Sequence, residues 1–340
     1  HSGRRRAPAC TLASNMLLSA LIAHQRNAYV SGRASAAASH LRDRGFAVLD
    51  HDPLDSSLVR PAATAICSEL DELLDLATRL GCDANEQHYR FSEVCHRARL
   101  RWDMRVPDAA VDKLVDAAVE RAMPVLRELD ALPLHPDERR LPLARRLPLR
   151  PRVLMTGAIV SKRGATAQRF HSDAQRSHFF WSTLLPRHRL FNLFVPLVDV
   201  EQDGFGTQFW PGSHLGRTRL PRYRAVIERS GSIEDDAEAM AAMEAPACKA
   251  GGLMLFDYRT MHRGLPNLGC DARPVAYAVI ATGAAWDTAN FPENSLRQSV
   301  ASIEEAVGDD IERLEALRDA TATYFPRWDE LECDPSCVSF

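Results

Sequence analysis

Residues 153–160 read VLMTGAIV, and this run marks the point where the character of the chain changes. Three similar runs follow: LFNLFVPLVDV at 190–200, GLMLFDY at 252–258 and PVAYAVIAT at 274–282. Each run is short and rich in β-branched and aromatic residues, and Gly, Pro, Asn or Asp separate the runs, which is typical of β-strands. Several such strands in one part of a chain predict a β-sandwich or a jelly roll.

The part of the chain before these strands has a helical pattern instead. Residues 57–80 and 108–130 place apolar side chains at helical spacing on one face, and Asp108 is positioned to cap the second helix. Residues 88–103 mix aromatics with arginines and show no helical period, while the proline- and arginine-rich residues 131–152 indicate an irregular connection. The sequence therefore predicts an α+β fold whose helices are mainly N-terminal.

No repeat is visible, and no low-complexity linker divides the chain after residue 45, so we expect one catalytic-size domain. The expected boundaries are a flexible or targeting-like segment at 1–40, the domain at 41–325 and a tail at 326–340. Within the domain we expect a helical part at 41–150, a jelly-roll core at 151–290, a helical insertion at 232–243 and a C-terminal helix at 299–320.

The composition is that of an ordinary globular protein, with 46% apolar and 26% charged residues among 340. A net charge of −3 argues against nucleic acid or an anionic membrane as partner. The eight cysteines show no zinc-ribbon or redox spacing, and the apolar run MLLSALIA is too short to cross a bilayer. We expect an intracellular protein with reduced thiols, not a secreted one, because no secretory signal is evident. Cytoplasmic and organellar locations both stay open, since the first acidic residue is Asp43 and the arginine-, serine- and alanine-rich start is equally typical of a transit peptide and of a disordered tail.

The chain contains two His-x-Asp triplets, His171 with Asp173 and His135 with Asp137. The second copy lies in the proline-rich connection, where the backbone has no strand period. The first copy lies where the β region is under way, and in a strand residues i and i+2 point to the same face, roughly 6–7 Å apart. An imidazole and a carboxylate at that spacing can converge on one metal ion, so we favour His171 and Asp173 as two ligands of a site that needs a third.

Three further features follow that triplet in a fixed order. DGFGTQFWPGSH at 203–214 combines a glycine turn, a short strand and a Pro-Gly-Ser-His corner. GGLMLFDYRTMHRGLPN at 251–267 then gives a strand that leads to His262, and Arg273 opens the last strand. Together these residues resemble the phytanoyl-CoA dioxygenase (PhyH)-like family of iron(II)- and 2-oxoglutarate-dependent oxygenases, over roughly residues 40–290.

The resemblance implies a double-stranded β-helix (jelly-roll, cupin-like) core flanked by helices. It also implies that His171, Asp173 and His262 bind iron(II) as a facial triad, and that Arg273 pairs with the distal carboxylate of 2-oxoglutarate. The family's chemistry consumes O₂, decarboxylates 2-oxoglutarate to succinate and CO₂, and hydroxylates an aliphatic carbon of a small or lipid-like substrate. In related halogenases Ala or Gly replaces the carboxylate ligand, so the presence of Asp173 favours hydroxylation.

Other residues of this region are further candidates for a place in or beside the site. Gln168 and Asn192 are candidates to face the cosubstrate, His214 is expected to pack beside the site, and His178 is expected in a lid. Residues 88–103 fit either an acidic substrate such as an acyl-CoA or a solvated face. For His262 a hydrogen bond to a backbone carbonyl is the competing explanation, and for Arg273 it is the general abundance of arginine in this chain.

Two alternatives to an oxygenase remain open from the sequence. The same barrel with zinc or manganese would suit an isomerase or a lyase, and a barrel without oxygen chemistry would be a binding module. The substrate and the oligomeric state are not readable from the residues.

Overall fold

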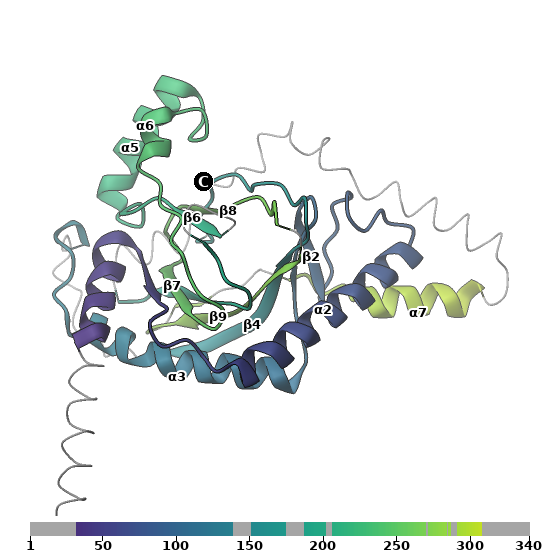
Figure 1. Ribbon diagram of the computed structural model, residues 1–340. Coiled ribbons are helices and arrows are strands. Elements are labelled where there is room, and N and C mark those ends of the chain that lie inside the picture. The colour runs from purple at the N-terminus through teal and green to yellow at the C-terminus, as the bar shows by residue number, and fades with distance from the viewer. Residues whose placement is uncertain are drawn as a thin grey trace, which may run out of the picture.

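The computed structural model of the chain describes residues 32–138, 151–174, 187–201, 206–269, 271–283, 285–286 and 291–307 (Figure 1). Its centre is an antiparallel sheet of seven strands in the order β1-β7-β5-β9-β4-β3-β2. The strands of this main sheet are β1 (Phe46–Leu49), β2 (Val94–Ala98), β3 (Arg101–Met104), β4 (Arg152–Ser161), β5 (Leu190–Pro196), β7 (Leu253–Asp257) and β9 (Arg273–Ala281). The four strands predicted from the sequence are confirmed as β4, β5, β7 and β9.

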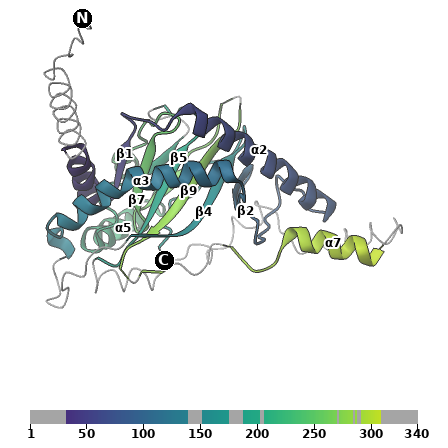
Figure 2. The same ribbon diagram turned by 90° about the horizontal axis from the view of Figure 1, so that it is seen from below.

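Two long helices cover one face of the main sheet (Figure 2). They are α2 (Ser56–Arg79) and α3 (Ala109–Ala131), and the Asp108 side chain caps α3 by accepting a hydrogen bond from the Ala110 amide, as predicted. Successive side chains of a strand alternate between the two faces of a sheet. On β9, Ala276, Ala278 and Ile280 therefore pack toward the helices, in one apolar cluster with Leu70 and Leu114 among others.

The other face of the main sheet lines the interior of the jelly roll. A second, small sheet lies opposite it and pairs β6 (Thr207–Phe209) with β8 (His262–Gly264) (Figure 1). Between the two sheets lies an apolar cluster rich in aromatic residues, which includes Phe194, Phe209, Phe256 and Tyr277. The structure thus has the jelly-roll core that the sequence predicted, with both faces of the main sheet buried.

The N-terminal part contributes more to the barrel than the sequence indicated. Strands β1, β2 and β3 come from the part expected to be helical, and two of them form the β2–β3 edge of the main sheet. Residues 32–44 are helical, and Ala38 and Leu41 of that helix are almost fully buried. The expected segment at 1–40 therefore ends too late, since its last residues pack against the core; its first 31 residues lie outside the described part.

The helices after β6 also differ from the expectation. The insertion expected at 232–243 contains only the short helix α6 (Ala237–Ala241), and it follows a longer helix, α5 (Gly216–Ser230), that the sequence analysis missed. The last described helix, α7 (Leu296–Val307), begins three residues before the helix expected at 299–320, and residues 308–320 of that helix lie outside the described part. In the described residues, no helix combines the length and apolarity that a membrane span requires.

Four charged side chains form a buried network where β5 begins and β7 ends. Arg189 and Arg259 both pair with Glu138, at 2.5 and 3.2 Å, and Arg259 donates to Asp257 at 2.7 Å. All four side chains are at most 7% exposed. Two guanidinium and two carboxylate groups neutralise one another here, so each charge depends on its partners to remain buried.

Replacing Asp257 by asparagine is expected to lower the free energy of unfolding by about 3–5 kcal/mol, because it leaves the buried guanidinium of Arg259 without its nearest carboxylate. Urea unfolding followed by circular dichroism measures this loss. Asp71→Asn is the matched control, since the ion pair of Asp71 with Lys162 lies on the surface and contributes little. Equal urea midpoints of unfolding for Asp257→Asn and Asp71→Asn would contradict a structural role for the network.

Candidate active site

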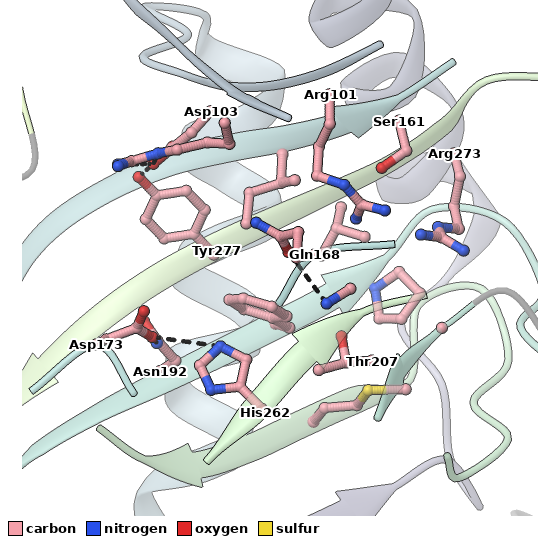
Figure 3. Close-up of a pocket in the computed structure, with 18 of the residues that line it drawn as sticks. Arg101, Asp103, Ser161, Gln168, Asp173, Asn192, Thr207, His262, Arg273 and Tyr277 are labelled. Carbon is pink, nitrogen blue, oxygen red and sulfur yellow. Dashed lines mark hydrogen bonds and ion pairs between the residues drawn. The ribbon is translucent and has the colours of Figure 1, made fainter. Parts of the chain in front are cut away.

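A pocket of about 170 Å³ lies inside the jelly roll, between the main sheet and the small sheet (Figure 3). All six residues singled out from the sequence as site candidates line it: Gln168, His171, Asp173, Asn192, His262 and Arg273. The remaining lining comes mostly from inward-facing residues of β3, β4, β5 and β9. The fold therefore gathers into one cavity residues that are far apart in the sequence.

His171 and His262 lie side by side because their backbones pair. The amide of each residue donates to the carbonyl of the other, at 2.9 and 2.8 Å, which adds residue 171 to the edge of β8. The centres of the two imidazole rings are 4.5 Å apart. A bridge between backbones holds both rings on the same side of the small sheet, so their proximity does not depend on side-chain rotamers alone.

The backbone also orients each ring. The Nδ1 of His171 lies 2.9 Å from the carbonyl oxygen of Arg169, and the Nδ1 of His262 lies 3.0 Å from that of Thr260. With Nδ1–H donating to a carbonyl, each ring presents Nε2 as an acceptor, which is the usual arrangement of a metal-binding histidine. Desolvation in the pocket, reinforced by neighbouring His262, lowers the pKa of His171 to about 4, so this ring is neutral at physiological pH and able to bind a cation.

Asp173 completes a group of three possible ligands. Its two carboxylate oxygens lie 3.7 Å from Nε2 of His171 and 3.6 Å from Nε2 of His262, and one ligand atom from each residue lies within 4.8 Å of the others. The side-chain amide of Asn192, on β5, donates to the Asp173 carboxylate at 2.6 Å. Two imidazoles and one carboxylate fit a divalent metal with open positions, and Asn192 fixes the carboxylate that lies close to both rings. Figure 3 shows Asp173, Asn192 and His262 close together.

The second His-x-Asp triplet has no comparable surroundings. His135 directly precedes a short 3₁₀ helix (Pro136–Glu138) that contains Asp137. The His171 group is the only such set of His, Cys, Asp and Glu ligands found among the described residues. His214 is fully buried with its Nε2 3.0 Å from the Arg42 carbonyl, and it does not line the pocket. Its ring packs against Gly45, just before β1, and its expected place beside the site stays a prediction. The lid expected around His178 lies outside the described residues.

The corner that precedes His214 supports the strand of His262. The hydroxyl of Ser213 donates to the Trp210 carbonyl at 2.6 Å and accepts from the amide of Met261 at 2.8 Å. Met261 is the residue directly before His262. The Pro-Gly-Ser-His motif therefore contributes to the site by anchoring β8, and none of its side chains reaches the pocket.

Two arginines occupy the other end of the pocket. Arg101 on β3, Ser161 on β4 and Arg273 on β9 form one row across three neighbouring strands, and all three face the cavity (Figure 3). Both guanidinium groups donate to the Leu265 carbonyl, and Arg101 also donates to that of Thr166. Neither arginine pairs with a carboxylate among the described residues, so this end of the pocket carries uncompensated positive charge.

Burial lowers the pKa of Arg273 to about 10, and burial together with the nearby Arg273 lowers that of Arg101 to about 9. Both therefore remain cations at neutral pH. The Nη1 of Arg273 and the Nε of Arg101 are buried without a hydrogen-bond partner in the described part of the chain. A bound carboxylate would satisfy these donors and neutralise the charge.

The sequence pattern did not single out Arg101. The signal was present, because residues 88–103 are rich in arginine and aromatic residues, but a solvated face was an equally good explanation. Instead, Arg101 is 3% exposed and Trp102 is fully buried. Gly264 allows Arg101 to extend into the pocket, since a Cβ at this position would lie 2.1 Å from its Nη1. Gln168, a sequence candidate, accepts a hydrogen bond from the Gly264 amide at 3.0 Å.

Residues 58–275 match the family model described as phytanoyl-CoA dioxygenase (PhyH). Similar solved structures include the non-haem 2-oxoglutarate-dependent epimerase SnoN from nogalamycin biosynthesis, at 16% identity and a TM-score of 0.46 over 77% of this chain and 95% of that one. HygX from Streptomyces hygroscopicus, with nickel, 2-oxoglutarate and hygromycin B bound, matches at 14% identity and a TM-score of 0.45, over 75% and 92% of the two chains.

Proposed function

We propose that this chain, which belongs to the phytanoyl-CoA dioxygenase family, is an iron(II)- and 2-oxoglutarate-dependent dioxygenase that hydroxylates an aliphatic carbon of a small or lipid-like substrate. The observation that carries the proposal is the convergence of His171, Asp173 and His262, with one ligand atom from each within 4.8 Å of the others. Iron(II) bound by these residues would supply the activation of O₂.

The protein's own groups have separable tasks in this proposal. His171, Asp173 and His262 hold the metal, and the backbone carbonyls behind the two imidazoles keep Nε2 of each ring directed at it. Asn192 orients the carboxylate ligand and is assigned to that task in place of direct contact with the cosubstrate.

Arg273 receives the distal carboxylate of 2-oxoglutarate, and Arg101 adds a second positive charge at the same end. At the other end, Phe209 and Phe256 of the cluster between the two sheets lie beside the His262 ring and shield it from water. Because the carboxylate ligand Asp173 occupies its position, that position is not open to a halide, which favours hydroxylation over halogenation.

The test is iron-dependent turnover of 2-oxoglutarate. Protein purified without metal and supplied with iron(II), O₂ and a panel of candidate metabolites is expected to release succinate and to consume O₂. Zinc in place of iron should give neither product formation nor O₂ uptake. Binding of 2-oxoglutarate to the manganese(II) form, measured by calorimetry, is the independent readout. A folded protein that binds no 2-oxoglutarate with manganese present would disprove the assignment.

A further inference from the structure

One cluster of pocket residues has no task in the proposed function. Arg97, Asp103 and Tyr277 line the pocket. Asp103 and Tyr277 lie at the end away from Arg101 and Arg273 (Figure 3). Asp103 accepts two hydrogen bonds from Arg97, at 3.1 and 2.6 Å, and a third from the Tyr277 hydroxyl at 2.8 Å. The cluster lies on the same side of the pocket as Asp173, so it borders the space next to the proposed metal.

A bulge in β2 brings Arg97 into this cluster. His96 pairs with Trp102 and Ala98 pairs with Arg101, which leaves Arg97 as an extra residue in a bulge of β2. Such bulges redirect a side chain relative to the regular strand. Here the Arg97 side chain turns toward Asp103 on the neighbouring strand.

Tyr277 reaches Asp103 across the intervening strand β4. Its partner residue on β4 is Gly157, and a Cβ at Gly157 would lie only 2.6 Å from the Tyr277 hydroxyl oxygen. The glycine inside the run VLMTGAIV therefore leaves room for the phenol to pass over β4. Burial, with the negative charge of Asp103 next in effect, raises the pKa of Tyr277, so the hydroxyl keeps its proton and stays a donor.

The arrangement leaves Arg97 able to bind a further group. Its Nε and Nη2 donate to Asp103, and Nη1 makes no hydrogen bond with the described residues, so it is available for an acceptor. The Arg97 side chain is 30% exposed, whereas that of Asp103 is 8% exposed. The carboxylate is thus enclosed behind a guanidinium that still faces the pocket. Its position is fixed by two hydrogen bonds, which is the preorganisation that a binding group requires.

The charges of the pocket indicate what that group is. The described lining residues include three arginines and two aspartates, which together leave one positive charge. Iron(II) and the two carboxylates of 2-oxoglutarate cancel one another. A buried cavity favours overall neutrality, because an uncompensated charge in a low-dielectric environment is costly. One more negative charge is therefore expected from the substrate.

We propose that the primary substrate carries a single carboxylate, which binds Arg97 at this end of the pocket while its alkyl chain extends toward the metal ligands. This proposal rests on the proposed function, since it assumes that 2-oxoglutarate occupies the end with Arg273. It makes Arg97 a specificity-determining residue for the substrate. Asp103 and Tyr277 are positioning residues that act by holding the guanidinium.

The experiment uses hexanoate as a probe and the manganese(II) form saturated with 2-oxoglutarate. Proton relaxation by manganese reports how close each part of the bound acid lies to the metal. Hexanoate is expected to bind, and its terminal methyl protons are expected to relax faster than the protons next to its carboxylate. Hexanamide, which has the same length without the charge, is expected not to bind.

Arg97→Gln is expected to weaken hexanoate binding tenfold or more and to leave the affinity for 2-oxoglutarate unchanged. The matched control is Arg99→Gln, because Arg99 is two residues away on the exposed turn and pairs with Glu86 instead. If Arg97→Gln does not fold, Arg97→Lys replaces it; a lysine keeps the charge but loses the two-pronged hold on Asp103, and at least threefold weaker binding is expected.

Three results would overturn the proposal: unchanged hexanoate affinity in the Arg97 variant, no hexanoate binding by the wild-type complex, or fastest relaxation next to the carboxylate. The last would mean that the acid binds the metal directly. A failure of the proposed function looks different, because the wild-type manganese form would then not bind 2-oxoglutarate at all.

Discussion

His171→Ala is expected to abolish 2-oxoglutarate turnover and to reduce metal affinity by about 100-fold or more, since even residues that only support metal ligands contribute 10- to 100-fold. The change removes one of the two imidazoles that converge with Asp173. The protein should still fold, because the His171 side chain is 39% exposed and the backbone bridge to His262 does not involve it. Titration with manganese(II), followed by electron paramagnetic resonance of the free ion, measures the loss.

The sequence supplies a matched control for this experiment. His135 heads the other His-x-Asp triplet, with the same spacing to Asp137, and it lies outside the pocket. His135→Ala is expected to bind manganese and to form succinate at the wild-type rate. An equal loss of manganese affinity in both histidine variants would mean that the geometry of the His171 group does not determine where the metal binds. Wild-type metal affinity in His171→Ala would contradict the assignment directly.

Arg273→Gln is expected to raise the dissociation constant of 2-oxoglutarate by about 100-fold, because removing one partner of a buried, hydrogen-bonded charge pair costs about 2–5 kcal/mol. Arg273→Lys should recover only part of this affinity, since an ammonium group cannot offer two parallel donors to a carboxylate. Manganese affinity should remain unchanged in both variants. Calorimetric titration of the manganese form with 2-oxoglutarate measures the effect.

Arg263 is the matched control for Arg273, because it is a second arginine close to His262 in the sequence. Although Arg263 directly follows His262 in the sequence, it does not line the pocket. Its Nε donates to Gln208, and its guanidinium lies over the Phe170 ring. Arg263→Gln is therefore expected to bind 2-oxoglutarate normally. Wild-type cosubstrate affinity in Arg273→Gln would show that the anion binds elsewhere, with Arg101 as the first group to examine.

Much of the fold was predictable because its signals are local. The strand runs at 153–160, 190–200, 252–258 and 274–282 are each bounded by residues that end strands, and all four lie in the main sheet. The helix at 108–130 was equally readable, since a capping aspartate and an apolar stripe are properties of a continuous segment. Strands β2 and β3 were missed because burial of their polar and charged residues depends on partners that are distant in sequence.

The sequence by itself determined which residues could hold a metal and an anion: the His-x-Asp triplet, the later histidine and the arginine that opens the last strand. Only the tertiary structure decided that they share one pocket, that Arg101 stands beside Arg273, and that a bulge and a glycine bring Arg97 and Tyr277 to Asp103. The physical reason is that strand register and cross-strand neighbours are set by backbone pairing between distant segments. A pattern along one segment does not contain that information.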